Sequence, residues 1–164
     1  MGLQLPGELR SLLSMLGYNW PEADEEKLFQ MGNAWLGFAG KVGQPLSDAD
    51  GHAQRVWSEN QGEGIEAFQQ AWGDAESPKT NLEDFTTAAN VIGAGLMVCA
   101  GIVLALKINV IVQLVMLAIE IAQATAEAIV TFGASLLEIP IFKEITGMIV
   151  DELIDLALQA ILNG

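Results

Sequence analysis

The side chains that could do chemistry are few and stand far apart in this sequence. The chain has one histidine, His52, and one cysteine, Cys99. A nucleophile needs a base beside it, and a zinc site needs several ligands, so these two residues supply neither arrangement. We interpret His52 as a solvent-facing polar residue. Cys99 lies in an apolar run, where a free cysteine behaves as a small core side chain.

Two further patterns resemble binding motifs, but ordinary helix chemistry explains both. The run Asp24, Glu25 and Glu26 follows Pro21, as expected at a helix start, where carboxylates complement the helix dipole. Residues 93–95 read Gly-Ala-Gly, yet no strand precedes them as a dinucleotide fingerprint requires. The sequence therefore predicts no catalytic residue, no cofactor and no metal site, and indicates a protein that is not an enzyme.

The charge balance narrows the possible partners. The chain has 21 Asp and Glu residues and 7 Lys and Arg residues, which gives a net charge of −14. Each half of the chain is net negative. Such a field repels phosphate backbones, so nucleic-acid binding is not expected, and a basic protein surface is the natural counterpart. The start of the chain has no basic segment followed by an apolar one, so we expect no cleaved signal peptide.

The first half contains helical periodicity. A short helix is expected over residues 9–16, and a second from Pro21 to a break at residues 43–45. Ser47 opens a third segment, a glycine-containing turn interrupts it, and the helical pattern resumes through residue 72. The turn residues are Asn60, Gly62 and Gly64. The residues expected to form a helix seam and partner-packing surface are Leu28, Met31, Trp35, Phe38, Val42, Trp57, Phe68 and Trp72.

The four tryptophans lie in this acidic half and leave two interpretations open. Their rings could fill the core, or they could enter a groove on a partner, because aromatic anchors dominate interface energies. A polar loop over residues 73–81 then separates residues 1–81 from residues 82–164 within one domain spanning residues 1–164.

The second half is poor in charge and raises the question of a membrane. Only four charged side chains occur in residues 85–142, and the longest uncharged run, 85–106, has a polar start that makes a membrane span marginal. A polar stripe at helical spacing favours a soluble helical bundle instead, because carboxylates are costly in lipid. The stripe consists of Asn109, Gln113, Glu120, Gln123, Glu127 and Thr131. A membrane-inserting hairpin stays as the alternative.

Three segments resemble a known family. They are residues 5–25, which include LPGEL and GYNWPEADE, residues 62–72 (GEGIEAFQQAW), and residues 131–135 (TFGAS). They resemble the WXG-like N-terminal domain of actinobacterial polymorphic toxins, which are type VII secretion effectors. The family's Trp-x-Gly turn would fall at residues 60–62, where Asn60 replaces the tryptophan and Gly62 is kept.

The resemblance implies an all-α, elongated helical bundle, in which a WXG-like hairpin over residues 21–72 packs on a second, apolar hairpin over residues 82–162. It further implies a non-enzymatic targeting and delivery domain, made in the bacterial cytoplasm and secreted without a cleaved signal peptide. The expected partners are the type VII secretion machinery or a small WXG-type protein, with a C-terminal toxin module if the chain is longer. The alternative is a hairpin that inserts into membranes and aids toxin translocation or forms a pore.

Overall fold

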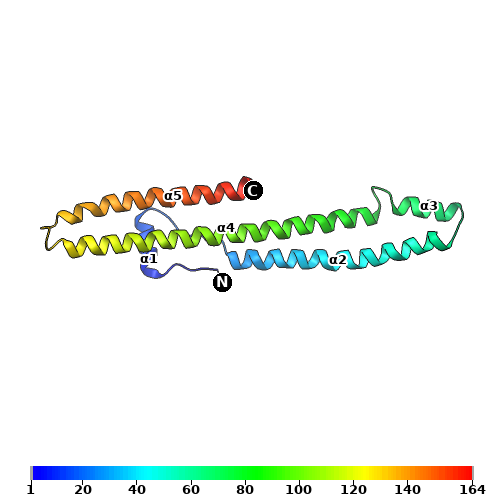
Figure 1. Ribbon diagram of the computed structural model, residues 1–164, viewed down its shortest axis with the longest axis horizontal. Coiled ribbons are helices and arrows are strands. Elements are labelled where there is room, and N and C mark those ends of the chain that lie inside the picture. Colours follow the sequence, from blue (N-terminus) through cyan, green and yellow to red (C-terminus); the bar gives the residue numbers. More distant parts are fainter. Residues whose placement is uncertain (1, 164) are drawn as a thin grey trace. The chain divides into compact units, whose positions relative to one another are not determined.

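The computed structural model describes residues 2–163, and every regular element in that range is helical. The elements in order are α1 (Gly7–Met15), α2 (Glu25–Glu59), α3 (Glu63–Trp72), α4 (Pro78–Glu127), the 3-10 helix η1 (Ala134–Glu138) and α5 (Ile139–Asn163) (Figure 1). The predicted all-α helical bundle is thus confirmed. The chain packs as two units, Leu28–Val98 and a second made of Met1–Lys27 with Cys99–Gly164, and α4 contributes residues to both.

In the unit Leu28–Val98, α2 packs on the first part of α4 through small residues. A Cβ atom added at Gly32 would lie 2.8 Å from the carbonyl oxygen of Gly93, so the two backbones are nearly in contact. Ala39, Ala53 and Ala89 are buried in the same unit. Close approach of this kind lets neighbouring side chains interdigitate at native density.

The expected helix break at residues 43–45 is wrong. Helix α2 runs unbroken for 35 residues with Pro45 inside it. A proline removes one backbone hydrogen bond and crowds the preceding turn, but it does not forbid a helix that neighbouring elements support. Here Val42, Pro45 and Leu46 line one apolar hollow together with Trp72, Pro78 and Leu82, so packing continues on both sides of the proline.

In the other unit, α1 and the segment that follows it pack on the second part of α4 and on α5. The core consists of Leu5, Leu13, Val110, Leu114 and Val150, with Tyr18 and Trp20 packed against it. The Tyr18 hydroxyl donates a hydrogen bond of 3.1 Å to the carbonyl oxygen of Gly147 in α5. The helix predicted over residues 9–16 is present as α1, and Gly17, with φ of 89°, follows it as the expected stop.

Two helix starts differ from the prediction by four residues each. Helix α2 begins at Glu25 instead of Pro21, because the Asp24 carboxylate accepts a 3.1 Å hydrogen bond from the Lys27 N–H and caps the helix there. Helix α4 begins at Pro78 instead of residue 82, and the Ser77 hydroxyl accepts a 3.1 Å hydrogen bond from the Thr80 N–H. In both cases a side-chain cap sets the boundary.

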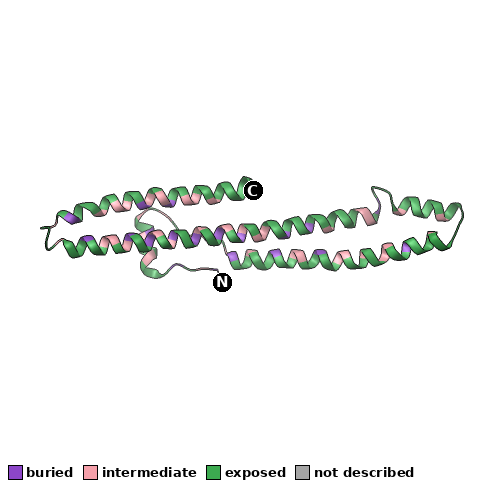
Figure 2. Ribbon diagram, in the orientation of Figure 1, coloured by how far each residue is buried: buried purple, intermediate pink, exposed green. Residues whose placement is uncertain are grey.

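The charge-poor part of the chain is only partly covered (Figure 2). Helix α4 contains a stretch of mean hydropathy 2.5, long and apolar enough to cross a membrane, of which 28% is buried. Core helices of soluble proteins also meet these criteria, and α4 is the one such helix among residues 2–163. Exposed apolar residues therefore accompany the polar stripe, in which Asn109, Gln123 and Glu127 face solvent.

Candidate interaction surface

The predicted seam on α2 is divided between two environments. Leu28, Trp35 and Val42 are half-buried, whereas Met31 and Phe38 are 51% and 44% exposed. The most deeply covered positions on this helix are small residues, Gly32 and Ala39 among them, which the sequence analysis did not select. The available signal was the presence of glycine and alanine at helical spacing, because small residues let helices approach closely.

Three aromatic rings form a partly exposed shelf on α2 and α4. Phe38 meets Phe85 edge to face, with ring centroids 5.6 Å apart, and Trp35 meets Phe38 in the same manner at 6.3 Å. Ala34, Trp35 and Phe38 line a shallow apolar hollow. We call the residues Ala34, Trp35, Phe38 and Phe85 the aromatic shelf. A shelf of rigid rings with little polar lining can receive an apolar side chain from another protein.

The remaining seam residues fasten α3 to α2. The Phe68 ring lies between those of Trp57 and Trp72, at centroid distances of 5.7 and 5.9 Å. The indole N–H of Trp72 donates a 2.9 Å hydrogen bond to the Asp50 carboxylate. Lys79, at the start of α4, lies 3.0 Å from the same carboxylate.

This network also affects ionisation. The hydrogen bond from Trp72, then that from Lys79, holds the pKa of Asp50 below its usual value. The hydrogen bond to Asp50 raises the pKa of Lys79. Both groups are therefore charged at neutral pH, and they join α2, α3 and α4 at this end of the unit Leu28–Val98.

A buried ion pair that was not predicted from the sequence lies in the other unit. Lys107, on α4, is 1% exposed and donates to the Glu25 carboxylate at 2.7 Å and to the Ala23 carbonyl at 2.6 Å. Its ammonium also stands 5.7 Å from the centre of the Trp20 ring. A single lysine in an apolar run was the available signal, since a buried charge requires a partner.

The second carboxylate oxygen of Glu25 accepts a hydrogen bond from the Leu3 N–H, and the Trp20 indole donates to the Leu3 carbonyl. Burial alone would raise the pKa of Glu25, but the hydrogen bonds from Leu3 and Lys107 outweigh it, and the pKa is lowered. The pair therefore stays ionised and fixes the N-terminal segment against α4.

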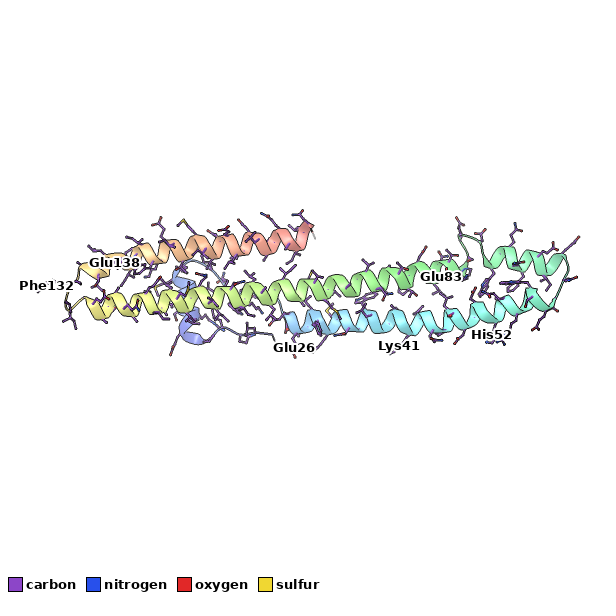
Figure 3. All side chains as sticks on the ribbon, in the orientation of Figure 1. Glu26, Lys41, His52, Glu83, Phe132 and Glu138 are labelled. Carbon is purple, nitrogen blue, oxygen red and sulfur yellow. The ribbon has the colours of Figure 1, made fainter. Side chains whose placement is uncertain are left out.

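The histidine and the cysteine belong to different helices. His52 is exposed on α2 (Figure 3), whereas Cys99 is half-buried on α4. Within residues 2–163 no group of three or more His, Cys, Asp and Glu side chains is arranged to hold a metal ion. The function is therefore argued from the aromatic shelf and from the contacts that hold α3 on α2.

A family model described as a WXG100-like domain matches residues 5–147. The chain belongs to the WXG100-like domain family. The match spans α1 to α4 and enters α5, so it covers most of the chain. No curated protein and no solved structure matches this sequence.

The turn expected at residues 60–62 lies between α2 and α3. Helix α2 ends at Glu59, just before these residues. Gly62 has φ of 124°, a conformation that favours glycine, and its carbonyl accepts from the N–H groups of Ile65 and Glu66. Asn60, where tryptophan would stand, donates a 2.8 Å hydrogen bond to the Val56 carbonyl. Gly64 lies in the first turn of α3.

A WXG100-like domain is a helical protein related to type VII secretion. Proteins of this family are secreted by type VII systems without signal peptides, and they associate with the secretion machinery or with WXG partners. The family typically serves as a secreted structural or partner domain. In this chain, the aromatic shelf and α3 are the surfaces to consider for contact with such partners.

Proposed function

We propose that this WXG100-like domain is a non-enzymatic targeting and delivery domain of an actinobacterial polymorphic toxin, exported by a type VII system. One observation carries the proposal. Large apolar side chains of the seam, Met31 and Phe38, are about half exposed on α2, although they stand at the spacing of a packed helix interface. A partner helix that covers them would complete the seam.

The partner in this proposal is a small WXG-type protein or a component of the secretion machinery. The aromatic shelf supplies the anchoring site, because rigid aromatic rings lose little conformational entropy on binding. The acidic surface, with a net charge of −14, favours a partner whose contacting face is basic. A toxin module joined to the C-terminal end of the domain would be the delivered cargo.

Export and partner binding provide the test. The full chain is expected to reach the culture medium of a host with an active type VII system and to stay inside when its ATPase is inactivated. Phe38→Ser should weaken binding to the cognate small WXG protein by about tenfold or more, because one buried aromatic side chain contributes that much. The control is Ile145→Ser on α5, which removes an apolar side chain of similar exposure, 47% against 44%.

Two outcomes would contradict the proposal. Export that continues without the type VII ATPase would separate the chain from that system. Equal loss of binding in the Phe38 and Ile145 variants would show that the aromatic shelf is not the contact. Circular dichroism of both variants is the control for retention of their helices.

A second candidate function rests on the apolar surface of α4. Its stretch of mean hydropathy 2.5, with 28% buried, suits a helix that crosses a bilayer after the bundle opens. This candidate is a membrane-inserting hairpin that aids toxin translocation or forms a pore. It predicts release of a dye trapped in liposomes at nanomolar protein, whereas the delivery proposal predicts none.

A further inference from the structure

The connection between α4 and α5 exposes several large apolar side chains that are close in sequence. We call residues 128–137 the apolar tip; it contains no charged residue. Phe132 is fully exposed, and Ile129, Val130 and Leu137 are 86%, 80% and 75% exposed. Figure 3 shows Phe132 where the chain turns back, with its side chain directed away from both helices. Contiguous exposed apolar groups mark a contact site on a protein or a membrane.

Several backbone N–H groups of the apolar tip are hydrogen-bonded locally, within the tip or to Glu127 just before it. Five of its N–H groups donate to carbonyl oxygens between residues 127 and 133, among them Gly133 to Ala128 at 2.8 Å. Loops exposed to water leave many such groups to the solvent, whereas lipid offers them no partner. This backbone can therefore leave water without losing these hydrogen bonds.

The polar side chains of the apolar tip are satisfied in the same way. The Thr131 hydroxyl donates to the Glu127 carbonyl at 2.9 Å, and the Ser135 hydroxyl donates to the Ala124 carbonyl at 2.7 Å. Ser135 is itself buried. A protein interface normally forms about one hydrogen bond for every 100–200 Å², and these groups are already occupied. The hydrogen-bond pattern thus favours lipid over protein as the contacting material.

Phe132 holds its exposed position in an unfavourable backbone conformation. Its φ is 51°, and it is the one non-glycine residue with positive φ among residues 2–163. Glycine and asparagine adopt this left-handed conformation readily, whereas a bulky side chain does so at a cost. Backbone conformations of this kind cluster at functional sites, so the exposed ring at this turn is a candidate contact residue.

We propose that the apolar tip inserts into the hydrocarbon of one leaflet of an electrically neutral bilayer. The insertion is shallow, because ten uncharged residues are about half of what a spanning helix needs. Glu127 and Glu138 flank the tip and are exposed, so they stay at the lipid surface. With the net charge of −14 they oppose binding to anionic headgroups. This contact differs from a hairpin that spans the membrane, and it does not depend on type VII export.

Vesicle flotation of the full chain tests the proposal. The protein is mixed with vesicles of pure phosphatidylcholine, and the bound fraction is measured after density-gradient centrifugation. Phe132→Asn removes the ring but suits the left-handed conformation, so the variant should melt at least as high as the wild type. We expect its partition coefficient to fall by about tenfold or more. The control is Leu162→Asn on α5, a side chain 78% exposed, which should bind as the wild type does.

Changing the lipid composition in the same flotation assay provides a second test. Replacing part of the phosphatidylcholine with phosphatidylglycerol should weaken binding of the wild type, because the acidic chain and the anionic surface repel each other. Binding that strengthens with phosphatidylglycerol would overturn the preference for a neutral bilayer.

Four results would overturn the insertion itself. The first two are a wild type that does not float at all and a Phe132→Asn variant that floats as well as the wild type. Dye release from the vesicles would indicate a spanning arrangement instead of a shallow one. A wild type that stays free of lipid but self-associates in analytical ultracentrifugation, with Phe132→Asn monomeric, would assign the apolar tip to a second copy of the chain.

Discussion

Lys107 carries a buried charge that depends on a single carboxylate partner. Its ammonium is buried beside Glu25, and the two groups belong to helices that are distant in sequence. We expect Lys107→Met to lower the free energy of unfolding by about 3–5 kcal/mol, because Glu25 would keep a buried charge without its cationic partner. Urea unfolding measures the change.

The controls for this prediction separate burial from charge. Lys27→Met removes a cation that is 75% exposed and lies 3.9 Å from Asp24, so it should cost no more than about 1 kcal/mol. The double variant Lys107→Met with Glu25→Gln should recover part of the loss, since no unpaired charge remains. A loss as small as that of the Lys27 variant would show that the Lys107–Glu25 pair contributes little.

The lowered pKa of Glu25 predicts how stability depends on pH. Its value lies below the ordinary 4.5, so the folded state binds fewer protons than the unfolded state as the pH falls. The contribution of Glu25 is therefore fully present above pH 4.5 and is lost as the pH falls through the lowered value. We expect the wild type to be more stable than Glu25→Gln at neutral pH, with the difference shrinking below pH 4.5.

Urea midpoints of the wild type and Glu25→Gln, measured from neutral pH down into the acid range, test this. Asp24 and Asp50 also have lowered pKa values, and they contribute equally to both proteins. The difference between the two curves therefore isolates Glu25. A difference that stays constant across the range would contradict the assignment.

At the scale of the helices, the contact between Gly32 and Gly93 sets how closely α2 and α4 pack. A Cβ atom at position 32 would lie 2.8 Å from the Gly93 carbonyl oxygen and 2.9 Å from the Met97 Cγ. Gly32→Ala is therefore expected to destabilise the protein by about 1–3 kcal/mol, because backbone must move to accept it. Gly95→Ala, with no atom within 4 Å, should instead stabilise α4 by about 0.5–1 kcal/mol.

Thermal unfolding of both variants checks the sign of each effect. The two variants are expected to change the melting temperature in opposite directions, although both add the same methyl group to a helix. Similar melting temperatures for the two variants would mean that α2 and α4 do not pack through Gly32.

Helical periodicity predicted the existence of the helices well and their ends less well. The apolar spacing located α1, α4 and α5, but side-chain caps at Asp24 and Ser77 moved two helix starts. Pro45 did not end α2, because local propensity gave way to packing along the helix. The partner of Lys107 could not be read from spacing, since the ion pair joins residues 82 positions apart. Trp35 and Phe38 of the aromatic shelf were predicted from sequence, whereas Phe85 and the glycine contact beside them were not.

At the scale of the whole molecule, the chain combines strong acidity with wide apolar exposure. Its charge of −14 is carried by 21 acids against 7 bases, and Lys107 is one of the few cations. Mutual repulsion among the acids favours the unfolded chain, in which charges stand farther apart. Apolar side chains left exposed on α4, Ile108 and Ile119 among them, add little to offset this until another surface covers them.

Salt should therefore stabilise the free protein. Raising NaCl from about 20 mM to about 300 mM shortens the screening length from roughly 20 Å to below 10 Å, which weakens repulsion between exposed carboxylates. The buried Lys107–Glu25 pair is screened much less and keeps its attraction. We expect the melting temperature to rise steeply at low salt and then level off. A melting temperature that falls with salt would mean that attractive surface pairs, such as Lys79 with Asp50, outweigh the repulsion. A linear rise without a plateau would indicate a salting-out effect on apolar surface instead of screening.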